Sequence, residues 1–200
     1  MHPNPAFRKA DAARNLDFAR RRGFGLLTVA GEPWPLAAHV PFLLSEDGGR
    51  VDAHLARSNP ILRALPALLA ASGPDGYVSP DWYGDPQQVP TWNYVAVHLR
   101  GRLSLAPPEG LRDHLRALSA RFEEALEKAP WRLEKMESET LEKMERAILP
   151  VTLQVEQVEG TWKLNQNKPE HARLGAAAAM EGSVGAELAA LAGLMRTPPA

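Results

Sequence analysis

Alternation of apolar and polar residues predicts a chain rich in extended segments. In Thr91–Leu105, the apolar residues Val95, Val97, Leu99, Leu103 and Leu105 occupy alternating positions, which is typical of a half-buried antiparallel strand. Residues 36–44 and 51–55 predict two more strands, and Glu46-Asp47-Gly48-Gly49 between them predicts a hairpin loop. Further strands are expected at residues 25–29, 77–80, 151–156 and 160–164.

Other segments carry apolar residues at helical spacing. Helices are predicted at residues 11–22, 109–128 and 138–148, and the second has a stripe that favours core packing: Leu111, Leu115, Leu118, Phe122 and Leu126. Ser58-Asn59-Pro60 is a typical helix start, so a helix is expected from there to about Leu69. The tail, residues 172–195, predicts one or two helices broken near residues 182–185.

This order of elements favours an α+β fold. The strands come with hairpin-type turns and few crossovers, which indicates an antiparallel sheet or barrel with peripheral helices and not a doubly wound parallel sheet. Two hundred residues suffice for one domain, alone or with a helical appendage.

Composition excludes several classes of function. The net charge is −1, so the electrostatic footprint of a nucleic-acid-binding surface is missing. The chain has no cysteine, and its six histidines show no metal-binding spacing, so no metal site is expected. No stretch reaches the ~18 apolar residues that span a bilayer. No signal-peptide pattern is present, so a cytoplasmic location is expected.

Five of the thirteen aromatic residues fall within residues 77–94. This window also holds Thr91 and Asn93, on either side of Trp92. Flat apolar faces beside hydrogen-bonding groups suit a planar heterocyclic ligand. The same composition is also typical of two aromatic-rich strands that pack a core.

Two other segments have binding character. In His54-Leu55-Ala56-Arg57-Ser58-Asn59-Pro60, a predicted strand leads into a helix N-terminus, which favours an anion beside the Arg57 fork. A simple N-cap with an exposed arginine is the alternative. Residues 163–168 cluster amides between two lysines, and amides can read the polar edge of a ring, although a solvated loop has the same composition. Together, the three segments match FMN, which has one phosphate and one planar ring.

These segments resemble the FMN-binding negative transcriptional regulators of the PaiB type, in the FMN-binding split-barrel superfamily. The resemblance is carried by the pattern H-x-A-R-x-N-P at residues 54–60, the sequence P-T-W-N-Y at residues 90–94, and the segments at residues 38–44, 77–83 and 163–168. It extends from near the N-terminus to about residue 170.

The resemblance implies a homodimeric, mostly antiparallel split β-barrel with FMN in the dimer cleft. Residues 1–170, including the helices at 109–128 and 138–148, would form the FMN-binding domain, and residues 171–200 a helical tail. It implies that Arg57, Ser58 and Asn59 hold the phosphate with His54 nearby, and that Thr91, Trp92 and Asn93 line the ring or ribityl chain. Gln166 and Lys168 would reach in from the last segment, in one version from the partner subunit.

The chain departs from the family pattern at three places. His2 stands in place of the usual tyrosine, Asn165 replaces a serine, and the loop at residues 84–88 is short and lacks a lysine. The loop change puts one basic contact with the ligand in doubt, so either weak FMN binding or a purified protein without FMN is expected.

Three functions are compatible with the resemblance. They are a flavin-dependent oxidoreductase or flavin reductase, a transcriptional regulator, and a structural dimer that has lost its ligand. No side chain is an evident catalytic acid or base; only His39 and His54 are candidates. Direct DNA binding has little support, because the helix at residues 138–148 carries Glu139, Glu142 and Glu145, which would repel phosphates.

Overall fold

The computed structural model describes residues 1–63 and 66–199. By their contacts, the residues form two compact units. The first contains residues 1–18, 71–98 and 158–200, and the second contains residues 19–70 and 99–157. Among the described residues, no helix has the length and apolar character needed to cross a bilayer.

Seven strands form one sheet in the order β1-β2-β3-β6-β5-β4-β7, counted over the described residues. Their bounds are β1 (Phe24–Val29), β2 (Leu36–Leu44), β3 (Arg50–Ala56), β4 (Ala67–Val78), β5 (Thr91–Leu105), β6 (Ile148–Lys163) and β7 (Gly185–Ala186). Strand β1 also pairs with β4, so the first six strands close into a ring. The predicted α+β fold with an antiparallel barrel is confirmed.

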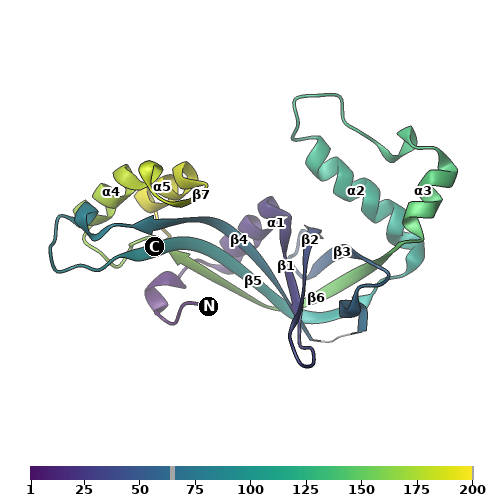
Figure 1. Ribbon diagram of the computed structural model, residues 1–200, viewed down its shortest axis with the longest axis horizontal. Helices are drawn as coiled ribbons and strands as arrows, with labels where there is room; N and C mark the ends of the chain where they lie inside the picture. Colours follow the sequence, from purple (N-terminus) through teal and green to yellow (C-terminus); the bar gives the residue numbers. More distant parts are fainter. Residues whose placement is uncertain (64–65, 200) are drawn as a thin grey trace. The chain divides into compact units, whose positions relative to one another are not determined.

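The helices are α1 (Ala12–Arg22), α2 (Leu111–Glu123), α3 (Ser138–Glu145), α4 (Glu170–Ala179) and α5 (Leu188–Arg196). In Figure 1, α2 and α3 lie side by side, as do α4 and α5 with β7. The tail was predicted as one or two helices broken near residues 182–185; two helices form, and the break near these residues is confirmed. The boundary predicted at residue 170 stays a prediction; α4 and α5 belong by their contacts to the first unit.

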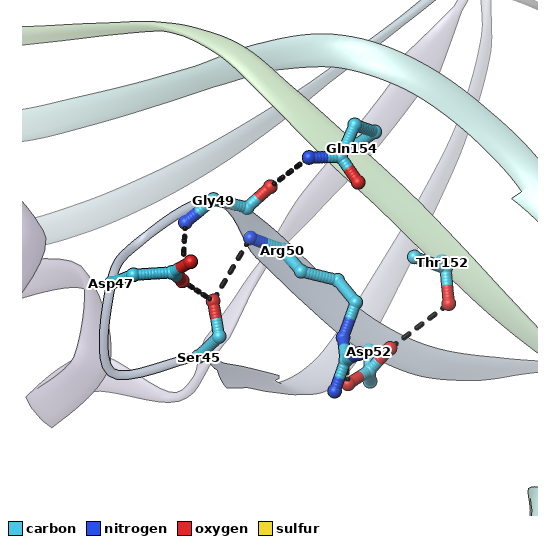
Figure 2. Close-up of polar contacts among 7 residues, drawn as sticks. All are labelled: Ser45, Asp47, Gly49, Arg50, Asp52, Thr152 and Gln154. Carbon is cyan, nitrogen blue, oxygen red and sulfur yellow. Dashed lines mark hydrogen bonds and ion pairs between the residues drawn. The ribbon is translucent and has the colours of Figure 1, made fainter.

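The predicted hairpin between β2 and β3 is confirmed, and its turn is held by side chains (Figure 2). Asp47 accepts hydrogen bonds from the Ser45 hydroxyl (2.6 Å) and the Gly49 N–H (3.0 Å), and these donors lower the pKa of its carboxyl group. The carbonyl of Gly49 accepts from the Gln154 amide (2.9 Å), and Asp52 accepts from Thr152 (2.9 Å). These contacts fix the register of β3 against β6.

The helix predicted from Ser58 to about Leu69 is wrong. Only a 3₁₀ turn forms, at Pro60–Arg63, and residues 64–65 lie outside the described chain. Strand β4 then begins at Ala67 and pairs with β1, with Ala67 opposite Val29 and Ala70 opposite Leu26. Closing the barrel overrides the helix propensity of alanine and leucine, and Pro66 removes a backbone donor that a continuous helix would need.

The barrel interior is filled by side chains. Apolar residues from six strands leave only about 10 Å³ among them: Leu27, Val40, Val51, Ala53, Leu69, Leu103, Val151 and Leu153. Such a space hardly holds one water molecule. The interior of the barrel therefore has no room for a molecule the size of a flavin.

Helix α2 covers part of the second unit and is shorter than predicted. Leu111 and Leu118 are buried, whereas Phe122 and Leu126, at the C-terminal end of the predicted stripe, are 39% and 51% exposed. The Phe122 ring still contacts the backbone at Gly23, where a Cβ atom would lie 3.0 Å from the ring. The predicted core stripe is therefore confirmed for its first part.

In the first unit, Asn15 of α1 joins a helix to β6. Its Oδ1 accepts a hydrogen bond from Trp162 Nε1 (2.8 Å), and its Nδ2 donates to the carbonyl of Ala10 (3.3 Å). A Cβ atom at Gly160 would lie 2.0 Å from Asn15 Oδ1, so only glycine allows this approach. The bond anchors the strand that leads directly into the segment at residues 163–168.

Candidate functional site

His54 of β3 makes a contact that its sequence did not indicate. Its Nδ1 lies 3.2 Å from Nε2 of His114 on α2, and the two rings meet edge to face at 5.4 Å. Burial lowers the pKa of His54. Burial, and then the neighbouring His54, lowers the pKa of His114 to about 4, although Asp52 acts in the opposite direction. Both rings are therefore neutral near pH 7, and one donates to the other.

Arg57 follows the end of β3 and is exposed. Its Nε donates to the carbonyl of Arg146 (2.9 Å), and its backbone N–H donates to the carbonyl of Ala147 (2.8 Å). An arginine has five N–H donors in a planar fork, so the two terminal nitrogens remain available beyond these contacts. The side chain is thus held in place while its fork can still bind an oxyanion.

Ser58 and Asn59 lie in the turn that follows. Asn59 Oδ1 accepts from the backbone N–H of Ile61 (3.0 Å), so Asn59 caps the 3₁₀ turn, while Ser58 is exposed. A turn of four residues has no helix dipole to attract an anion. The helix N-terminus that was predicted to attract a phosphate is therefore absent from this segment. Arg57 is the cation of residues 54–60 that can still bind one.

A hollow of about 490 Å³ opens beside Arg57. It is also lined by two further arginines and three glutamates: Arg112, Arg146, Glu109, Glu142 and Glu145. Arg112 pairs with Glu145 at 2.7 Å, and Arg146 lies 4.0 Å from Glu142. These two pairs balance one another and Glu109 offsets Arg57, so the hollow carries no net charge and an anion would depend on the fork of Arg57 itself.

Thr91, Trp92 and Asn93 begin β5 in the first unit. Trp92 is 46% exposed and its indole meets the Tyr77 ring edge to face at 6.4 Å. Asn93 is fully buried, and neither its amide nitrogen nor its amide oxygen has a hydrogen-bond partner among the described residues. Leaving such groups unpaired costs about 1–3 kcal/mol of stability each. An ordinary buried amide has hydrogen-bond partners, and that of Asn93 has none among the described residues.

Residues 163–168 form the second half of this group. The Lys163 ammonium donates to the Thr91 hydroxyl, and the Lys168 ammonium donates to the Gln88 amide oxygen. Lys168 also lies over the Tyr83 ring, 5.3 Å from its centroid. Thr91 and Lys168, predicted as site residues, thus belong to one polar cluster.

Gln166 is held by the backbone. Its amide oxygen accepts from the N–H of Leu164 (2.8 Å), and its amide nitrogen donates to the carbonyls of Ala6 (3.1 Å) and Trp162. Both of its N–H donors are therefore in use. Gln166 therefore holds the segment at residues 163–168 in place through backbone hydrogen bonds. Its hydrogen bonding to a flavin ring stays a prediction.

The predicted residues fall into two groups, one in each unit. His54, Arg57, Ser58 and Asn59 lie in the second unit, and Thr91, Trp92, Asn93, Gln166 and Lys168 lie in the first. Four participants were not predicted as site residues: His114, Lys163, Tyr83 and Asn165. Lys163 and Asn165 stand within the singled-out segment, but His114 carries no local signal, because its partner is 60 residues away.

The residues present fit FMN. Arg57 offers an anchored fork for a phosphate, Trp92 offers an exposed indole for a ring, and the buried amide of Asn93 has unused donors and acceptors. Among the described residues, no three histidine, aspartate or glutamate side chains gather in a way that could hold a metal ion.

Comparisons with known proteins agree with this chemistry. The model of a family described as "Putative FMN-binding domain" matches residues 1–157. The chain is 29% identical to "Protease synthase and sporulation protein PAI 2" of Bacillus subtilis over 170 residues. This alignment covers 82% of this chain and 81% of that protein. It is 35% identical over 99 residues to an uncharacterized protein, YKL070W, of Saccharomyces cerevisiae, which covers 42% of this chain and 59% of that protein.

Two solved structures share the fold. An FAD and heme binding protein from Mycobacterium smegmatis superposes with a TM-score of 0.56 at 18% identity, covering 78% of this chain and 73% of that one. The flavocytochrome Anf3 from Azotobacter vinelandii gives 0.57 at 16% identity, covering 81% and 72%. The resemblance inferred from the motifs is confirmed, as is FMN as the family's cofactor: this chain belongs to the family described as "Putative FMN-binding domain" and is similar to the PAI 2 protein.

Proposed function

We propose that this chain binds FMN where two copies of the chain meet. The observation that carries the proposal is the family match over residues 1–157, which contains both the H-x-A-R-x-N-P pattern and the P-T-W-N-Y sequence. The filled barrel interior supports a site on the outside of the fold, as an interface between copies requires.

The phosphate is assigned to Arg57. Its Nε–H bond to the carbonyl of Arg146 orients the guanidinium group, so little side-chain entropy is lost when the terminal nitrogens bind two phosphate oxygens. Ser58 lies exposed beside it and can donate its hydroxyl. Asn59 contributes indirectly, because it caps the turn that follows Arg57. His54 also contributes indirectly, because its contact with His114 holds β3, the strand that precedes Arg57.

The ring is assigned to the start of β5. The exposed indole of Trp92, braced by Tyr77, supplies a flat apolar face. The amide of Asn93 has a donor and an acceptor that match the N–C=O edge of the flavin ring. Because Asn93 is buried in the single chain, the residues around it must move before its amide can bond to the ring. Thr91 and Lys168 line the polar side of this wall, and Gln166 fixes the segment that carries Lys168.

The dimer explains why the assigned residues come from separate units. In this proposal, Arg57 and Ser58 come from one copy, and Lys168 with its segment comes from the partner copy. Exposed aromatic side chains support burial in an assembly: Trp34 is 76% exposed and Phe24 is 51% exposed.

Bound FMN would supply electron transfer, and the chain supplies binding and orientation. No residue assigned here is an evident general acid or base, since the Nδ1 of His54 is engaged with His114. An oxidoreductase that moves electrons between FMN and a small molecule is therefore the form of enzyme that this site supports. A role as a transcriptional regulator would act through a partner, because the net charge of −1 does not favour direct DNA contact.

Titration of the protein with FMN and with riboflavin, followed by flavin fluorescence, tests the assignment. Riboflavin lacks the phosphate, so Arg57→Ala should weaken FMN binding by about 1.5–3 kcal/mol, roughly 10- to 150-fold, and leave riboflavin binding unchanged. Arg102→Ala is the matched control, because Arg102 is an exposed arginine of the same unit that pairs with Glu156. Equal FMN affinity in wild type and Arg57→Ala would remove Arg57 from the phosphate site.

A further inference from the structure

Two lysines of the first unit lie close together without a carboxylate partner. Lys163 ends β6, and Lys168 follows after one turn. Their hydrogen-bond partners are neutral: the Thr91 hydroxyl and the Gln88 amide. Within the described chain, neither ammonium group has a carboxylate at ion-pair distance, although many exposed arginines of this protein do.

The electrostatics of this pair are unfavourable in the isolated chain. Burial lowers the pKa of Lys163, and the positive charge of Lys168 lowers it further. Lys163 in turn contributes to the lowered pKa of His2, after burial. The only carboxylate coupled to Lys168 in these interactions is Asp85, which is engaged by the amide of Gln88 and the N–H of Gln87. The positive charge of Lys168 thus disfavours the protonated form of Lys163, and Lys163 disfavours that of His2.

A third feature lies in the same cluster. Asn165 stands in the turn between the lysines in the left-handed region, with φ of 61°. Its Oδ1 accepts from the Tyr83 hydroxyl (3.3 Å), and Lys168 lies over that same ring. Asn165 is only 2% exposed, and its Nδ2 has no hydrogen-bond partner among the described residues. A buried N–H donor therefore stands unpaired beside two cations.

We propose that Lys163 and Lys168 form a second oxyanion site, which holds the phosphate of a small molecule other than FMN. Two ammonium groups match the two negative charges of a phosphate monoester, and the Thr91 hydroxyl and the Asn165 amide are neutral donors of the kind that complete such a site. The inference rests on the proposed function in one respect: Lys168 is also assigned to the flavin wall, so the bound phosphate compound would lie beside the flavin.

Calorimetric titration with inorganic phosphate tests this site in the FMN-loaded and the flavin-free protein. Lys163→Gln removes the charge and keeps a polar side chain, so phosphate affinity should fall at least about tenfold. Lys163→Arg should retain most of it, and Lys143→Gln, at an exposed lysine of α3, should leave it unchanged. Phosphate should also raise the pKa of His2, measured by NMR of its imidazole ring.

The outcomes separate this site from the FMN site. The inference holds if wild type binds phosphate with FMN present, and if Lys163→Gln loses phosphate without weakening FMN more than riboflavin. It is overturned if phosphate fails to bind, or if Lys163→Gln weakens FMN but not riboflavin, because Lys163 would then hold the flavin's own phosphate. If FMN does not bind at all, the proposed function fails, and the titration of the flavin-free protein still decides whether the lysines hold an oxyanion.

Discussion

Acidification should destabilise this protein through the contact between His54 and His114. The pKa of His114 lies at about 4, whereas a histidine in an unfolded chain titrates near 6.5. The folded state therefore binds this proton more weakly than the unfolded state. The contribution to stability is complete above pH 6.5 and is lost as the pH falls towards 4. The difference in pKa corresponds to ~3 kcal/mol when both states are fully titrated, of which ~2 kcal/mol is lost between pH 7 and pH 5.

Urea denaturation at a series of pH values between 7 and 5 measures this loss. In His114→Gln, the free energy of unfolding should depend on pH less steeply than in wild type, by ~2 kcal/mol over this range. His171→Gln is the control, since His171 is exposed on α4. The slope with pH is compared, so a constant cost of the substitution does not matter. Identical pH dependence in wild type and His114→Gln would refute a buried, neutral His114.

Three further changes test the packing and the site. Asn93→Leu removes a buried amide without partners, so it should stabilise the flavin-free protein by up to about 1–3 kcal/mol in denaturation and weaken FMN binding; a large loss of stability would contradict this. Gly101→Ala should cost about 1–3 kcal/mol, because its Cβ atom would lie 1.8 Å from the Gln154 carbonyl oxygen, whereas Gly110→Ala, with open space around it, should stay within ~0.5 kcal/mol in the same assay. Asn15→Leu should destabilise the first unit by about 1–3 kcal/mol, because the buried N–H of Trp162 loses its acceptor; unchanged thermal unfolding would contradict this.

The strands of this fold were predicted well where alternation was complete. Thr91–Leu105 and Leu36–Leu44 match β5 and β2 to the residue, and the hairpin turn before Arg50 was evident from its glycines. Local patterns failed where pairing across the barrel decides the structure. Leucine and alanine at residues 67–70 favour a helix locally, but their strand neighbour in β1 lies about 40 residues earlier and leaves no mark in the local pattern.

The site shows the same division. Motifs predicted a flavin site in the segments around Arg57, Trp92 and Lys168, because each contains several residues whose chemistry suits a flavin, and this assignment stays a prediction. They did not identify His114, which reaches His54 from α2, or the buried environment of Asn93. Tertiary packing sets both, and single-sequence patterns do not report it.

The central claim is most directly tested by adding FMN to the purified protein, removing unbound flavin by gel filtration, and recording the visible spectrum and the mass of the eluted species. The account predicts a yellow species with the mass of two chains, one FMN per chain, and a flavin band that bleaches with dithionite. A colourless protein eluting at the mass of one chain, with all FMN in the unbound fraction, would contradict it.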